Sequence, residues 1–164
     1  MIFKKNVHNI TLYNTLLTLS RNIFFYKEVA LKDIFETRIY LMLMHFALIL
    51  IVFKKKKVKF PQILYDSLFH SIENNLRELG QGDVAVNKKM KEINKILYDI
   101  LLKIKTDEIK FQLNKDLILK YFAELKDINN NKYKLFNDYF VRFYNYCFEL
   151  SPENMIKDDL NFKL

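Results

Sequence analysis

The longest apolar run in the chain covers residues 39–53, is interrupted by His45 and ends at four consecutive lysines. A helix needs about twenty apolar residues to cross a bilayer. The run therefore predicts a helix that is buried on nearly all sides within the protein, and insertion into a membrane is the alternative. Asp33 and Glu36 are spaced as in a capping box just before it, so we expect the helix to begin near Ile34.

A second helix is predicted from Pro61, a residue suited to the first helical position, to about Leu79. Apolar residues recur in it at four-residue spacing and form one stripe, which predicts a face turned to the core: Leu64, Leu68, Ile72 and Leu76. After it, Gly80 is expected to take the left-handed conformation of a helix end, and Asp83 to cap the next helix. Together with Gly82, these residues predict a tight structural turn between two helices.

The remainder of the chain also has a helical pattern. Residues 84–105 predict an amphipathic helix with lysines largely off its apolar face, and Thr106–Glu108 is expected to open a further helix that reaches about Lys126. Residues 133–148 contain eight aromatic residues and predict a helix whose rings pack in the core or line a client-binding groove. A short last helix is expected from Ser151.

Composition agrees with this pattern, because the chain contains only two glycines and two prolines and shows no alternation typical of strands. We therefore predict an all-α fold, a single compact domain of six to eight helices over residues 1–164. Within it, residues 1–24 are expected to form an N-terminal helical extension, and residues 128–164 the aromatic-rich C-terminal helices.

The net charge of +8 is concentrated near the start of the chain. Residues 1–60 hold 11 Lys and Arg against 3 Asp and Glu, whereas the remainder is neutral. Such an asymmetry favours contact with phosphates of an anionic membrane surface or of RNA. The residues expected to make this contact follow the apolar run: Lys54, Lys55, Lys56, Lys57 and Lys59. A lysine-rich codon composition and an ordinary solvated loop are the alternative explanations.

Candidate catalytic chemistry is scarce. No histidine has the spacing of a metal site, and His45 within the apolar run is interpreted as a hydrogen-bonded core residue. The glycines of the predicted turn follow a helix, which argues against a nucleotide-binding loop. Cys147 has no partner for a disulfide and no histidine or acid near it in sequence. We therefore expect no enzyme activity, no metal and no cofactor.

The run N-L-R-E-L-G-Q-G-D-V-A-V-N-K-K-M-K, residues 75–91, resembles the signature stretch of the bacterial ubiquinol-cytochrome c chaperone family, relatives of the mitochondrial factors that assemble cytochrome b. Residues 33–38 and the helix before the signature are also similar to that family. The resemblance covers roughly residues 25–125. Gln81 departs from the family, whose bacterial members usually carry an apolar residue there.

This resemblance implies an all-helical, cofactor-free chaperone that binds newly made cytochrome b during assembly of the cytochrome bc1 complex. It also implies possible association with the ribosome near its exit tunnel and with a small partner subunit. The signature residues expected to contact a partner are Arg77, Glu78, Lys88, Lys89 and Lys91. DNA is not an expected partner.

With the basic segment, the resemblance predicts a cytoplasmic protein attached to the surface of the inner membrane. The main alternative is a non-enzymatic basic helical protein that binds RNA or the ribosome through the same lysines. A structural protein of the membrane surface with no client is a third hypothesis.

Overall fold

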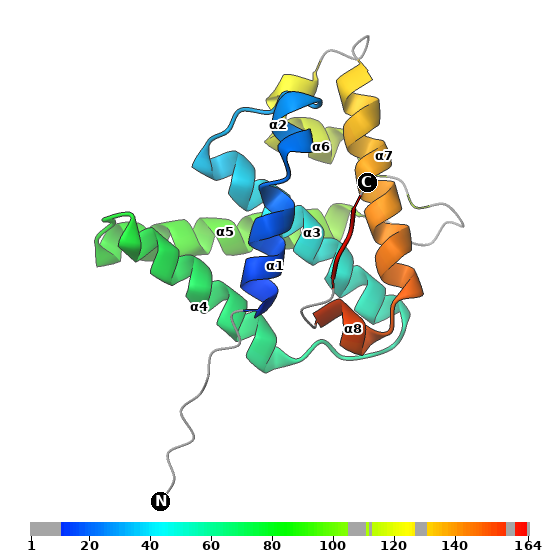
Figure 1. The fold of residues 1–164 in the computed structure, drawn as a ribbon. Helices are drawn as coiled ribbons and strands as arrows, with labels where there is room; N and C mark the ends of the chain where they lie inside the picture. The colour runs from blue at the N-terminus through cyan, green and yellow to red at the C-terminus, as the bar shows by residue number, and fades with distance from the viewer. Residues whose placement is uncertain (1–10, 105–110, 112, 127–130, 157–159, 164) are drawn as a thin grey trace, which may run out of the picture.

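The computed structural model describes residues 11–104, 111, 113–126, 131–156 and 160–163. The described residues form helices and no strand, which confirms the predicted all-α class and single domain (Figure 1). The elements are α1 (Thr11–Ser20), α2 (Ile23–Lys27), α3 (Phe35–Lys55), α4 (Gln62–Glu78), α5 (Asp83–Lys103), α6 (Lys115–Tyr121), the 3₁₀ helix η1 (Ala123–Leu125), α7 (Asn131–Glu149) and α8 (Pro152–Ile156).

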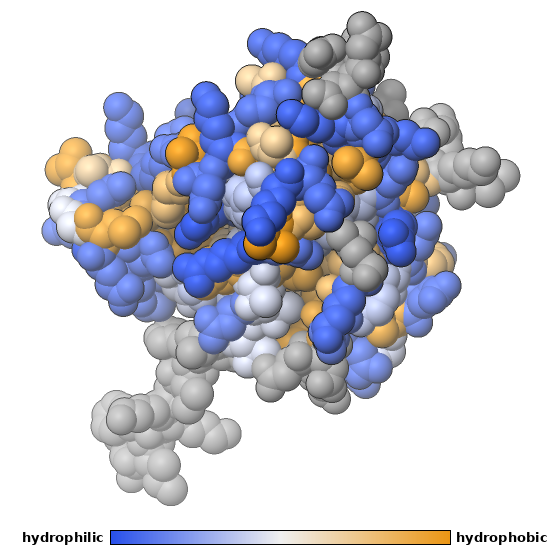
Figure 2. Space-filling view, turned by 45° about the horizontal axis from the view of Figure 1, so that its top comes forward, coloured by the Kyte–Doolittle hydropathy of each residue, from blue (hydrophilic) through white to orange (hydrophobic). Residues whose placement is uncertain are grey.

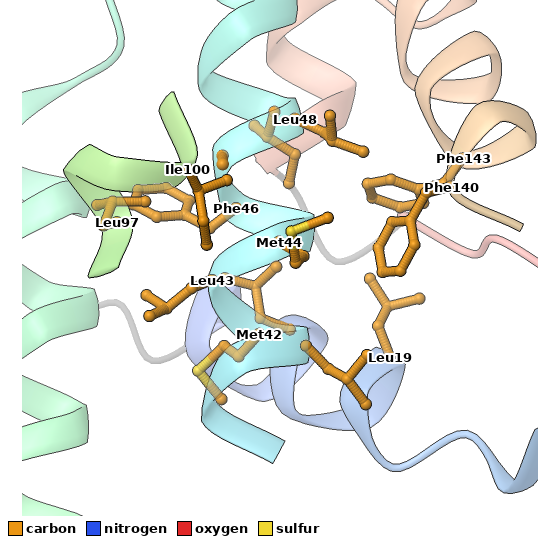
Figure 3. Close-up of a cluster of buried hydrophobic side chains, with 14 of the residues drawn as sticks. Leu19, Met42, Leu43, Met44, Phe46, Leu48, Leu97, Ile100, Phe140 and Phe143 are labelled. Carbon is orange, nitrogen blue, oxygen red and sulfur yellow. The ribbon is translucent and has the colours of Figure 1, made fainter. Parts of the chain in front are cut away.

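The central element is α3, against which α1, α5 and α7 all pack. Fourteen of its 21 residues are buried, because its apolar residues occur on every side of the helix. Figure 3 shows side chains of three other helices around it: Leu19 from α1, Leu97 and Ile100 from α5, and Phe140 and Phe143 from α7. The helix is long and apolar enough to cross a membrane, but 72% of its most apolar window is buried inside this protein. The apolar run is therefore a core helix in this fold.

The capping of two helices differs from the sequence prediction, although α3 begins at Phe35, next to the predicted Ile34. The N-cap of α3 is Ile34, and no side chain caps it. Asp33, expected to form a capping box, instead accepts a hydrogen bond from Nε of Arg38 at 2.9 Å, because that guanidinium lies one turn into the helix and attracts the carboxylate. At α4, Pro61 is the N-cap residue and the helix begins at Gln62.

The helix expected from Thr106 is shorter than predicted. It begins at Lys115, where the side chain of Asn114 accepts hydrogen bonds from the amides of Asp116 at 3.0 Å and Leu117 at 3.2 Å. This N-cap satisfies amides that would otherwise be unpaired and so fixes the start of α6. The predicted opening residues, 106–108, lie outside the described residues.

Most aromatic residues of α7 pack into the core. Phe136, Phe140 and Phe143 are fully buried, and Tyr139 is 1% exposed. The burial of these rings favours the predicted core packing over a client-binding groove. Phe148, near the end of the helix, is 45% exposed, and Tyr133 and Tyr146 are partly buried.

The rings of α7 surround His45, which is completely buried at the middle of α3. The ring nitrogen Nδ1 lies 2.6 Å from the carbonyl oxygen of Leu41, and Nε2 lies 2.8 Å from the hydroxyl of Tyr139. Since a carbonyl can only accept, Nδ1 carries the proton and donates, while Nε2 accepts from the Tyr139 hydroxyl. This confirms the interpretation of His45 as a hydrogen-bonded core histidine, with both nitrogens engaged by protein groups.

Burial disfavours the charged imidazole and lowers the pKa of His45 to about 4, from 6.5. Between these two values the unfolded chain binds more protons than the folded protein. The stability contributed by neutral His45 is therefore fully present above pH 6.5 and is lost progressively as the pH falls towards 4.

The lowered pKa of His45 predicts how the stability of the protein depends on pH. Between pH 7 and pH 5 the free energy of unfolding should fall, with His45 contributing a slope of up to about 1.4 kcal/mol per pH unit. Urea unfolding of His45→Gln should show a lower stability at neutral pH and a reduced slope. Asn74→Gln, an exposed change at a non-titrating residue of α4, is the control and should keep the wild-type profile. An unchanged slope in His45→Gln would contradict this account.

Candidate interaction surfaces

The turn between α4 and α5 is a capped helix end. Gly80 has φ +88°, and its amide donates to the carbonyl of Arg77 at 2.9 Å. The amide of Gln81 reaches back to the carbonyl of Leu76 at 3.3 Å. This pair of bonds is the Schellman arrangement, which requires the left-handed conformation that glycine adopts most readily. It stops α4 and directs the chain into α5.

Arg77 holds the two sides of this turn together. Its guanidinium forms ion pairs with Glu73, at 3.0 Å, and with Asp83, the first residue of α5. The hydrogen bonds that the guanidinium donates, first to Asp83 and then to Glu73, raise the pKa of Arg77. Asp83 is therefore not the N-cap predicted from the sequence. Gly82 occupies that position without a side-chain hydrogen bond, because the Asp83 carboxylate is directed back to Arg77.

Gly82 has no backbone requirement for glycine. Its φ of −75° and ψ of 166° are open to any residue, and a Cβ there would have no atom within 4 Å. The two glycines of the predicted structural turn therefore have different physical roles.

Helices α4 and α5 form a hairpin, and its tip, at the turn between them, carries exposed apolar and charged side chains side by side. Leu79 is 62% exposed and Val84 is 85% exposed. Figure 1 shows the joined ends of α4 and α5 projecting from the helices around α3, and Figure 2 shows hydrophobic surface at this left-hand end. Exposed apolar side chains next to charges are common at surfaces that bind other proteins. Neither residue was predicted from the sequence to be a contact.

The three signature lysines lie along the first turns of α5. Lys88 and Lys91 are exposed, whereas Lys89 is partly buried and pairs with Glu92 at 3.5 Å. Glu78 is exposed at the end of α4. Of the five residues expected to bind a partner, Arg77 and Lys89 thus have intramolecular ion pairs, and the other three are solvent-exposed.

The basic segment, residues 54–59, lies at the end of α4 that is opposite the hairpin tip. A helix of 17 residues is about 25 Å long, so the two regions are about that far apart. Lys54, Lys55, Lys57 and Lys59 are exposed. Lys56 differs from them: it donates to the carbonyl of Leu150, and its Nζ lies 5.3 Å from the centre of the Phe148 ring. It connects the end of α3 to the end of α7.

A left-handed residue also ends α3, but it is not glycine. Lys57 has φ +56°, and its amide donates to the carbonyl of Lys54 at 3.0 Å. The amide of Val58 donates to the carbonyl of Phe53, also at 3.0 Å. This second Schellman turn projects the lysines beyond the helix end, where their charge complements the helix dipole.

No group of three or more candidate metal-ligating side chains occurs among the residues that the structure describes. The thiol of Cys147 is fully buried, and this burial raises its pKa to about 12. A thiol in that state is a poor nucleophile.

The two glycines of the turn can be separated by substitution. Gly80→Ala should lower the free energy of unfolding by about 1 kcal/mol, because a Cβ is strained at positive φ. Gly82→Ala, its matched control, should change it by less than about 0.5 kcal/mol. Urea titrations of the two variants measure both values, and an equal loss in each would show that the left-handed conformation does not control the turn.

The comparisons with known proteins bear on both surfaces. The family model described as ubiquinol-cytochrome C chaperone matches residues 27–117, which include α3, α4, α5, the basic segment and the hairpin tip. No curated protein matches the chain, and no solved structure does. Because the family match covers more than half of the sequence, the protein belongs to the ubiquinol-cytochrome c chaperone family.

Proposed function

We propose that the protein is a non-enzymatic assembly chaperone of the cytochrome bc1 complex that binds newly made cytochrome b at the cytoplasmic surface of the inner membrane. The family match is the observation that carries this proposal. The family is described as ubiquinol-cytochrome C chaperone, and a chaperone acts on a client protein. The residue numbers matched include the exposed hairpin tip and the basic segment.

The physical need for such a chaperone follows from the client. Cytochrome b consists of membrane helices, and these expose apolar faces until haem and partner subunits are in place. A binder that remains near the membrane can cover part of that surface. The exposed Leu79 and Val84, with the charged side chains of Glu78, Lys88 and Lys91 around them, supply a mixed apolar and polar surface of the required kind.

The basic segment supports attachment to an anionic leaflet. Each lysine near such a surface contributes up to about 1 kcal/mol. Lys54, Lys57 and Lys59 are exposed at one end of α4, so they can face phosphates while the hairpin at the other end contacts a client. Lys56 contributes less, because it is engaged with Leu150 and Phe148.

Deletion of the gene in the organism that carries it tests the assembly role. Haem-loaded cytochrome b, measured by difference spectroscopy, and assembled bc1 complex, measured on native gels, should both fall selectively and return with the intact gene. Normal levels of both in the deletion strain would contradict the proposal. RNA or ribosome binding by the same lysines would then become the better hypothesis, with an affinity for RNA alone that falls steeply with salt.

Membrane attachment is tested separately with purified protein and vesicles. Replacement of Lys54, Lys57 and Lys59 by Gln should weaken binding to vesicles containing phosphatidylglycerol about a hundredfold, since three contributions of about 1 kcal/mol are lost. The triple variant Lys88→Gln, Lys91→Gln and Lys95→Gln on α5 removes the same charge; it is the matched control and should bind nearly as the unchanged protein does. Equal loss in the two variants would indicate a response to net charge and not a membrane-facing segment.

A further inference from the structure

A cavity of about 170 Å³ lies between α1, the start of α3 and the end of α4. Its apolar lining comes from all three helices. Ile39, Met42 and Ile72 are buried, Leu17 is partly buried, and Leu79 at the hairpin end is mostly exposed. The cavity therefore has an apolar interior that continues into the exposed surface of the hairpin tip.

The polar groups of the cavity include one internal pair. The side-chain amide of Asn75 donates to the hydroxyl of Tyr13 at 3.2 Å. Asn75 and Leu79 both belong to the segment that resembles the family signature, and they lie one helical turn apart on α4. The signature segment thus contributes directly to the cavity.

Two arginines line the cavity, and only one of them forms an ion pair within the described residues. Arg38 is paired with Asp33 at 2.6 Å. Arg21 is exposed at the end of α1, and no carboxylate within the described parts of the chain forms an ion pair with it. Tyr13, which lines the cavity, is within electrostatic range of both Arg21 and Glu78. The guanidinium of Arg21 is therefore available to pair with a carboxylate of a bound partner.

The size of the cavity distinguishes between kinds of occupant. Small-molecule sites usually measure about 300–1,000 Å³. A smaller apolar cavity next to exposed apolar surface suits a single anchoring side chain of a protein partner, surrounded by weaker contacts. We infer that this cavity receives an apolar side chain of the client polypeptide, and that an acidic residue next to that side chain pairs with Arg21.

This inference rests on the proposed function, since it assigns the client-binding site of the same chaperone. It is tested with overlapping fluorescent peptides that cover cytochrome b of the same organism, by anisotropy with the full-length protein. Peptides that contain an apolar residue beside Asp or Glu should bind, and alanine in place of the apolar residue should weaken binding about tenfold or more.

Substitutions in the chaperone give the matched test. Leu17→Trp, which fills the cavity with an indole, should weaken peptide binding about tenfold or more, whereas Leu102→Trp, at a site 82% exposed on α5, should not. Arg21→Glu should also weaken binding, and a peptide whose acidic residue is replaced by Lys should recover it. Because Arg21 is exposed, this charge exchange remains informative even where Leu17→Trp disturbs folding, which thermal unfolding detects.

Peptide binding that is unaffected by Leu17→Trp in a folded protein, or by Arg21→Glu, would overturn the inference. So would binding of phosphatidylglycerol vesicles that depends on Leu17 while no peptide binds. Failure of the inference is distinguishable from failure of the proposed function. If gene deletion abolishes bc1 assembly and both the Leu17→Trp and the Arg21→Glu proteins restore it fully, the function stands and the cavity is not the client site.

Discussion

The burial of α3 is the constraint on which the rest of the structure depends. A 21-residue helix that is apolar on all sides is stable in water only if other helices cover it. In this fold α1, α5 and α7 supply that cover. The single polar side chain at its middle, His45, is tolerated because Leu41 and Tyr139 satisfy both ring nitrogens.

This arrangement leaves two regions free for other molecules. The hairpin of α4 and α5 buries its apolar stripes near α3, but its tip extends beyond them, so Leu79 and Val84 remain exposed there. The end of α3 is the second region, where a left-handed Lys57 terminates the helix and exposes the neighbouring lysines. The two regions stand at opposite ends of α4, which allows one to face lipid while the other contacts a client.

Much of this fold could be predicted from the sequence. The continuous apolar run identified α3, helical patterning identified α4, α5 and α7, and glycine chemistry identified the left-handed Gly80. The errors at helix starts share a physical cause. Asp33 and Asp83 were expected to cap helices, but Arg38 and Arg77 bind their carboxylates instead. Capping patterns are local, and they do not reveal a competing cation one turn away along the helix or on the preceding helix.

Contacts between distant segments were not predictable in the same way. His45 and Tyr139 are 94 residues apart, so the sequence indicated a core histidine without identifying its partner. The cavity beside Arg21 likewise needs three helices in their final positions. The exposed residues of the signature segment could be proposed as contacts, but only the fold separates Arg77 and Lys89, which have intramolecular ion pairs, from Lys88 and Lys91.

The central claim is that this chaperone holds new cytochrome b before the bc1 complex forms. The most direct test is pulse labelling of newly made proteins, followed by capture of the tagged chaperone at successive chase times and identification of labelled cytochrome b on gels. The account predicts that cytochrome b is captured early and leaves the chaperone as the labelled complex appears on native gels. Absence of labelled cytochrome b at every chase time, in cells that still assemble the complex, would contradict it.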